Sequence, residues 1–294
     1  MSLTLHFEYP NQTSDRRPYE HFVKAALAPT LAEDTTATHV IFSGNFDRSV
    51  NDRLASPDRA FRSTHRAGAG LTVAKTMKSP RGVNCSDIIV NRPLLTPDLT
   101  RVRVGGMSGS APRFLAHEFL HAGIRRRGEP STPGDTDRTF WSTRAWRTLD
   151  EHRVERALCR TWPQDVDYIG DYADFGTDFV RGLRETRGDV AQHVLGRFPS
   201  LCEKLAYAFA AAGVTDPVAA AHRLPRPSAL RRDGLVPVAV AESLLAAPDA
   251  LTPAPAEELV AHADRIRCAL QSWLRDLGYT VEMFDEGMVG VFSV

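Results

Sequence analysis

The sequence predicts an α+β protein in which a mixed N-terminal half is followed by a mostly helical C-terminal half. Short β-branched and alternating runs occur in the first hundred residues and again at the C-terminus, and such runs are typical of strands. Between them, apolar residues recur mostly at helical spacing, with Gly or Pro at many segment ends. We expect two domains, residues 1–163 and residues 164–294, with the second packing on the cleft of the first.

The N-terminal half should form a mixed sheet and two helices. Four segments are predicted strands: Leu3–Tyr9, Thr38–Ser43, Leu71–Thr76 and Ser86–Asn91. A helix is expected over Tyr19–Ala32, where apolar residues recur at helical spacing. A second helix should begin at Ser108 or Ser110, which are suitable N-caps, and run to about Arg127 before Gly128.

Most of the remaining chain is expected to be helical. The predicted helices are Arg144–Thr161, Tyr172–Thr186, Val190–Leu195, Leu201–Ala212, Pro217–His222, Pro237–Ala247 and Ala254–Leu277. The Arg- and Pro-rich residues 222–237 are the best candidate for an exposed loop or subdomain joint. The last sixteen residues predict a β-hairpin that turns at Asp285–Gly287.

Charge and cysteine content exclude several classes of protein. The 36 basic and 36 acidic side chains cancel, which argues against a general nucleic-acid binder. There is no run of eighteen apolar residues and no signal-peptide pattern at the N-terminus, so we expect no membrane association. The four cysteines are widely spaced and form no C-x-x-C pair, which is typical of reduced thiols in a cytoplasmic protein.

The strongest chemical signal is His117-Glu118-Phe119-Leu120-His121, an H-E-x-x-H pattern in the second predicted helix. Residues i and i+4 share one helix face, so both imidazoles can reach one Zn²⁺. Glu118 then faces the zinc-activated water and can take its proton as general base. About 0.016 such matches are expected by chance in a chain of this composition, so the pattern is informative.

A catalytic zinc site needs a third protein ligand besides the two histidines. Residues 124 and 127 are Ile and Arg, so a third histidine at the H-E-x-x-H-x-x-G-x-x-H spacing is absent. The segment LDEHRVERAL instead offers Glu151, 30 residues after His121, and Glu155 one turn later. We expect Glu151 to ligate zinc and Glu155 to orient a ligating histidine. The reverse assignment stays open. By itself the segment fits a solvated charged helix better, and the site interpretation depends on the need for such a helix near the two histidines.

Over residues 86–160 the chain resembles the zincin metallopeptidases, and more narrowly the gluzincin type, which pairs H-E-x-x-H with a downstream Glu. The resemblance implies a zinc-dependent peptidase with a twisted N-terminal sheet above the active-site helix. In such folds an edge strand often binds the substrate backbone by strand addition. Residues 71–76 or 86–92 are the candidates for that strand.

Three further residues are candidates for stabilising an oxyanion: His152, beside the proposed ligand, and Tyr168 and Tyr172, downstream of it. A buried tyrosine with a satisfied hydroxyl is the commoner situation. The loop GGMSGS at residues 105–110 is either an anion-binding nest or a flexible hinge over the cleft.

These observations predict a cytoplasmic zinc metallopeptidase that hydrolyses a bond in a peptide or protein substrate. Two other functions stay open. One is a zinc-dependent amidase or tailoring hydrolase that acts on a small molecule. The other is a catalytically inactive interaction or regulatory protein built on a zincin scaffold.

Overall fold

In a computed structural model the chain forms two compact units. Unit 1 comprises Met1–Glu129 and Arg160–Val166, and unit 2 comprises Pro130–Cys159 and Asp167–Val294. The structure describes residues 4–9, 15–27, 37–54, 73–82, 85–95, 99, 110–131, 139–162, 167–185, 190–224, 238–283 and 289–294. The division differs from the boundary expected at residue 163, because most of the Glu151-bearing helix groups with the C-terminal half.

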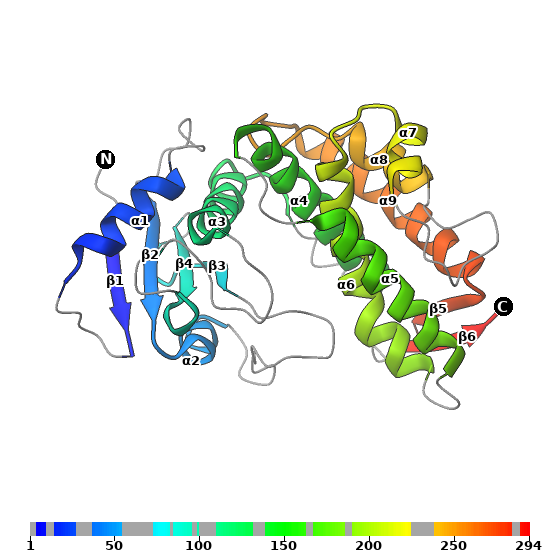
Figure 1. Cartoon of the computed structure of the whole chain (residues 1–294), viewed down its shortest axis with the longest axis horizontal. Helices are drawn as coiled ribbons and strands as arrows, with labels where there is room; N and C mark the ends of the chain where they lie inside the picture. The colour runs from blue at the N-terminus through cyan, green and yellow to red at the C-terminus, as the bar shows by residue number, and fades with distance from the viewer. Residues whose placement is uncertain are drawn as a thin grey trace. The chain divides into compact units, whose positions relative to one another are not determined.

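The described residues of unit 1 form a four-stranded sheet and three α-helices (Figure 1). Its elements are β1 (Thr4–Glu8), α1 (Arg17–Leu27), β2 (Thr38–Ser43), α2 (Phe46–Asn51), β3 (Ala74–Lys78), β4 (Ser86–Asn91), the 3₁₀ turn Arg92–Leu94, and α3 (Ala111–Arg126). The strands β2 and β4 match the predicted bounds. The prediction missed α2, a short helix capped by the Asn45 side chain, which accepts a hydrogen bond from the Arg48 amide at 3.2 Å.

The strand order in the sheet is β1-β2-β4-β3. The pairs β1–β2 and β2–β4 are parallel, whereas β3 runs antiparallel to β4. One row across the sheet is His6, Ile41, Ile89 and Lys75. Because β4 pairs on both sides, the expectation that residues 86–92 form the substrate-binding edge is wrong. The other candidate is better placed, because β3 is the last strand of the sheet that the described residues form.

The two faces of this sheet carry different layers. On one face Phe42 packs against Tyr19 of α1, with ring centroids 4.6 Å apart. Side chains alternate between faces, so Ile41 points the other way, where it forms an apolar cluster with Phe46 and Val50 of α2. The sheet therefore has α1 on one face and α2 on the other.

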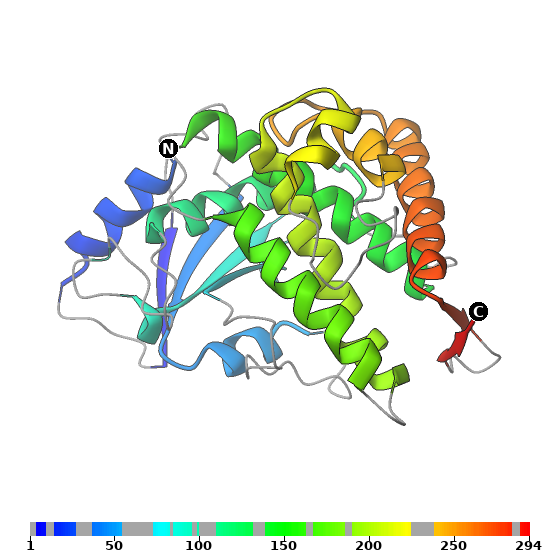
Figure 2. The same cartoon turned by 45° about the vertical axis from the view of Figure 1, so that its right-hand side comes forward.

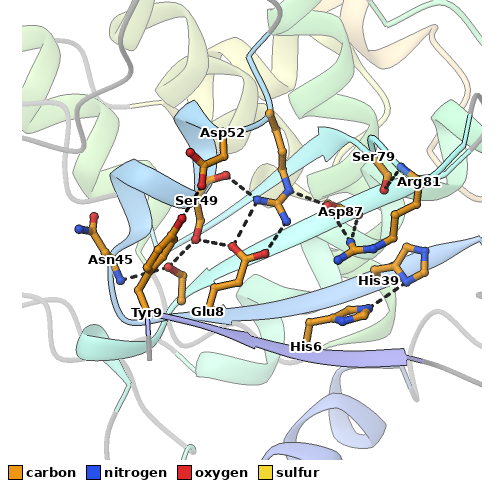
Figure 3. Close-up of polar contacts among 12 residues, drawn as sticks. His6, Glu8, Tyr9, His39, Asn45, Ser49, Asp52, Ser79, Arg81 and Asp87 are labelled. Atoms are coloured by element: carbon orange, nitrogen blue, oxygen red, sulfur yellow. Dashed lines mark hydrogen bonds and ion pairs between the residues drawn. The ribbon is translucent and has the colours of Figure 1, made fainter. Parts of the chain in front are cut away.

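An ion-pair network lies beside α2 on this second face (Figure 3). The Asp87 side chain of β4 has no solvent exposure, and its Oδ2 accepts a hydrogen bond from Arg53 Nε at 2.6 Å. Arg53 also reaches Glu8 of β1, with Nη2 2.8 Å from Oε1. Arg81, in the turn between β3 and β4, places Nη1 3.1 Å from Asp87 Oδ2. The network therefore ties the end of α2 and the β3–β4 turn to the sheet.

Two histidines lie next to the network on neighbouring strands (Figure 3). His6 Nε2 is 3.3 Å from His39 Nδ1, a distance that fits a hydrogen bond between neutral rings. Burial lowers the pKa of both imidazoles, and the Arg81 guanidinium lowers them further. The neutral forms are therefore favoured in the folded state.

Unit 2 is a helical assembly that ends in a β-hairpin. Its elements are α4 (Phe140–Thr161), α5 (Tyr168–Glu185), α6 (Val190–Ala212), α7 (Pro217–Arg223), α8 (Val238–Leu245), α9 (Ala256–Asp276), β5 (Tyr279–Met283) and β6 (Val289–Ser293). Helices α5 and α6 lie side by side in both views (Figures 1 and 2). The strands pair antiparallel as predicted, and the expected turn lies outside the described residues.

The core of unit 2 is made of large aromatic side chains from several helices. Phe198 of α6 contacts Trp141 of α4 and Trp273 of α9, with ring centroids 5.9 and 5.5 Å away. The Trp141 Nε1 donates a hydrogen bond to the Val281 carbonyl at 3.1 Å, which links α4 to the hairpin. Each aromatic ring removes a large apolar area from water, so these contacts hold the helices together.

The expected break between residues 195 and 201 is wrong, because α6 continues through Pro199. A proline within a helix removes one backbone hydrogen bond and costs about 3 kcal/mol. On either side of it, Phe198, Leu201 and Cys202 are buried in the core. Burial of side chains this size contributes about 1.5–3 kcal/mol each, which offsets that cost.

The predicted α+β class, with an N-terminal mixed sheet and a helical half that ends in a hairpin, is confirmed. Helix α1 spans Arg17–Leu27 and so begins earlier than predicted, whereas the rest of the predicted helix, residues 28–32, lies outside the described residues. The 105–109 part of the GGMSGS loop and residues 225–237 lie outside the described residues. None of the described helices has the length and apolar character needed to cross a bilayer.

Candidate metal centre

Helix α3 carries the H-E-x-x-H pattern and is well anchored in unit 1. It begins after Ser110, with Pro112 in the first turn, where the missing amide hydrogen is tolerated. It ends at Arg126, and Gly128 follows with φ of 71°, a backbone conformation that favours glycine. Its apolar side chains Leu115 and Leu120 are about 1% exposed. This packing fixes the rotation of the helix about its axis.

The two histidines of the pattern converge on one point. The Nε2 atoms of His117 and His121 are 2.9 Å apart, and the ring centroids are 4.7 Å apart. Two nitrogens bound to one tetrahedral zinc, with Zn–N of about 2.0–2.1 Å, would be separated by about 3.3 Å. A small widening would therefore let a metal ion replace the hydrogen shared by the two rings. The donor pair fits a Zn²⁺ ion.

Glu118 is held by the edge strand of the sheet. The Thr76 hydroxyl of β3 lies 2.7 Å from Glu118 Oε2 and 2.9 Å from the Glu118 carbonyl oxygen. The hydroxyl hydrogen can be donated to either acceptor, and the carboxylate is the closer one. The contact brings β3 next to the H-E-x-x-H segment of α3, and it orients the Glu118 carboxylate.

The Glu151 carboxylate belongs to α4 and contacts Tyr207 and Arg147 within unit 2. The Tyr207 hydroxyl of α6 donates to Glu151 Oε2 at 2.7 Å. The Arg147 Nε is 4.0 Å from Glu151 Oε1 but only 2.5 Å from Glu203 Oε1. Burial and the neighbouring carboxylates, Glu151 first among them, raise the pKa of Tyr207. The phenol therefore keeps its hydrogen and acts as a donor to Glu151.

Glu155 lies one turn further along α4 and is 2% exposed. Its charge also raises the pKa of Tyr207, although less than that of Glu151 does. The sequence interpretation gives Glu155 the role of orienting a ligand. Since α3 and most of α4 belong to different compact units, the choice between Glu151 and Glu155 as zinc ligand stays a prediction.

The three candidates for oxyanion stabilisation are all buried in unit 2. His152 is 0% exposed, its Nδ1 lies 3.1 Å from the Ala206 carbonyl, and burial lowers its pKa to about 4. Tyr172 is 1% exposed, and burial raises its pKa. Tyr168 packs on Tyr207, with ring centroids 5.3 Å apart. These placements favour packing roles, and an oxyanion role for any of them stays a prediction.

Two residues around the expected site were missed by the sequence interpretation. Thr76 was treated only as part of a strand, although a hydroxyl on a candidate edge strand could have marked it. Tyr207 has no sequence signal, because it lies 56 residues from Glu151 in an ordinary amphipathic helix. Only the packing of α4 against α6 brings the two side chains together.

Comparison with known proteins adds no family to this picture. No protein-family model matches the chain, and neither a curated protein nor a solved structure matches it. A function for this chain therefore has to be inferred from its own residues.

Proposed function

We propose that the chain is a zinc-dependent metallopeptidase. The observation that carries the proposal is the arrangement on α3. Two imidazole nitrogens 2.9 Å apart lie on one helix face, and Glu118 beside them is held by Thr76 of the edge strand. Two neutral imidazoles with an adjacent carboxylate are the donors and the base that zinc-dependent hydrolysis requires.

We further propose that Glu151 is the third ligand and that Glu155 orients the ligand set. Two histidines and a carboxylate could hold a metal ion, and His₂Glu is an established set for catalytic zinc. When bound, the ion would supply a Lewis acid that polarises a carbonyl and lowers the pKa of a water molecule. The donor set alone does not select zinc over other divalent transition metals, so metal identity belongs to the test.

The proposed roles of the other residues follow from their positions. Glu118 takes a proton from the attacking water and passes it to the leaving amine. The Thr76 hydroxyl orients this carboxylate through Oε2. Strand β3 offers an edge to which an extended peptide can add as a further strand. This last feature favours a peptide substrate over a small molecule.

A cytoplasmic location is part of the same proposal. The four cysteines are thiols in the structure, in keeping with a reducing compartment.

The test begins with the metal content of the purified protein, measured by elemental analysis. We expect about one zinc per chain in the wild type and little in His121→Ala. The Glu118→Gln variant should keep its zinc. It should also lose about 10²- to 10⁴-fold of any hydrolytic rate on a fluorogenic peptide library, since it removes the general base.

The outcomes separate the open alternatives. A wild-type protein that takes up no zinc, even on addition, contradicts the hydrolase proposal. Zinc with hydrolysis of small amides but not peptides would indicate the amidase alternative. Zinc without Glu118-dependent hydrolysis would indicate an inactive scaffold protein.

A further inference from the structure

The Glu151 carboxylate is held by a residue far away in the sequence. Tyr207 donates its hydroxyl hydrogen to Glu151 Oε2 at 2.7 Å. The Tyr207 ring packs against Tyr168, with centroids 5.3 Å apart and the planes tilted by 47°. Both tyrosines and Glu151 belong to unit 2. The Tyr207 ring that carries the donor hydroxyl is therefore held by packing and is not an exposed side chain.

From this geometry we propose that Tyr207 is the positioning residue of the metal centre, which orients the Glu151 carboxylate for the ion. The inference rests on the proposed function, because it takes Glu151 to be the third ligand. Tyr207 itself does not contact metal or substrate. It acts through the carboxylate that it binds.

The hydrogen bond leaves a defined oxygen for the metal. A carboxylate that uses one oxygen for a metal can rotate about its terminal bond, and a donor on the second oxygen stops this rotation. Here Tyr207 binds Oε2, so Oε1 is the oxygen assigned to the ion. Removing partners of this kind typically lowers metal affinity about 10- to 100-fold.

The surrounding charges favour a neutral donor in this position. The Arg147 guanidinium lies nearer to Glu203, with Nε 2.5 Å from Oε1, than to Glu151, at 4.0 Å. A closely paired arginine would offset the negative charge that attracts a metal cation. A phenol orients the carboxylate through a hydrogen bond and adds no positive charge beside it.

The experiment measures the dissociation constant of Zn²⁺ for the full chain by competition with a chromophoric chelator. The variants are Tyr207→Phe, Glu151→Gln and the double variant. The matched control is Tyr279→Phe, which removes another unit 2 hydroxyl, one that lies 3.5 Å from the Leu183 carbonyl. Circular dichroism and thermal unfolding of the metal-free variants report folding, and the absorption spectrum of bound Co²⁺ reports ligand geometry.

We expect Tyr207→Phe to raise the dissociation constant about 10- to 100-fold, to alter the Co²⁺ spectrum, and to have no further effect in the Glu151→Gln background. Tyr279→Phe should leave the dissociation constant within about threefold of wild type. The partner of the Tyr279 hydroxyl is the Leu183 carbonyl, and at 3.5 Å this contact is at the limit of a hydrogen bond.

Four outcomes would overturn the proposal, and one of them would also contradict the proposed function. Tight wild-type binding that is lost in His121→Ala but unchanged in Tyr207→Phe would exclude the positioning role alone. Independent, additive effects of Tyr207→Phe and Glu151→Gln would exclude that role as well. Absence of wild-type binding would remove both this role and the proposed function. If the Tyr207→Phe variant fails to fold, the Glu151→Asp variant is measured in its place, because the shorter side chain withdraws the carboxylate from the Tyr207 hydroxyl. Affinity unchanged in that variant would also contradict the role.

Discussion

Replacing Asp87 with Asn should destabilise unit 1 by about 3 kcal/mol. The carboxylate is fully buried and receives two guanidinium groups, from Arg53 at 2.6 Å and from Arg81 at 3.1 Å. Removing one partner of a buried ion pair typically costs about 3–5 kcal/mol, because the other charge stays buried without its counter-ion. Arg53, whose side chain is 5% exposed, keeps Glu8 at 2.8 Å. The expected loss is therefore at the lower end of that range.

The assay is urea unfolding followed by circular dichroism, with hydrogen exchange of β2 and β4 as a local measurement. In thermal unfolding, the same loss of about 3 kcal/mol would lower the Tm by about 10 °C for a domain of this size. The matched control is Asp52→Asn, since the Asp52 carboxylate is exposed and accepts a hydrogen bond from the Tyr9 hydroxyl at 2.6 Å. We expect the control to change stability by less than about 0.5 kcal/mol. An equally small effect of Asp87→Asn would refute the reasoning.

Three other predictions concern packing, protonation and metal. Gly182→Ala should destabilise unit 2 by about 1–3 kcal/mol, because its Cβ would overlap the His193 ring. At Gly196 an added Cβ meets open space, so Gly196→Ala should stabilise unit 2 by about 0.5–1 kcal/mol. If both variants shifted the Tm in the same direction, thermal unfolding would contradict this prediction. His6 and His39 have lowered pKa values, so below pH 6.5 the unfolded chain binds more protons and stability should fall as pH falls toward 5. A pH-independent free energy of unfolding in that window, or no difference from a His39→Gln variant, would exclude this linkage. Removing zinc with a chelator should lower the Tm of wild type but not of a variant that lacks the two α3 histidines.

Local patterns were sufficient for most elements of the fold. The strands β2 and β4 match the predicted bounds, because a run of β-branched residues between turn signals has few other conformations available. The prediction was wrong at Pro199, where a helix-breaking residue lies inside α6. Propensity is a local preference of a few kcal/mol, and burial on both sides of the proline exceeds it. It also missed α2, whose six residues are too few to show a period.

The sequence indicates the candidate site residues to different extents. His117 and His121 are four residues apart on one helix, so their spacing in the sequence already placed them on one face, with Glu118 next to the first histidine. The structure adds the 2.9 Å separation of the imidazole nitrogens and the hydroxyl that holds Glu118. Which glutamate completes the ligand set depends on contacts between distant segments, and spacing alone cannot encode these.

The sequence by itself therefore determined the class of fold, the helix that carries His117, Glu118 and His121, and the absence of a net charge that would attract nucleic acid. Only the tertiary structure decided which strand forms the sheet edge beside Glu118, that Asp87 is buried between two arginines, and that Tyr207 binds Glu151. The physical reason is the distance along the sequence between the residues that interact. Spacing along the chain fixes neighbours within one helix or strand. Partners that lie 42 or 56 residues apart, as for Thr76 with Glu118 and Tyr207 with Glu151, meet only when separate elements pack.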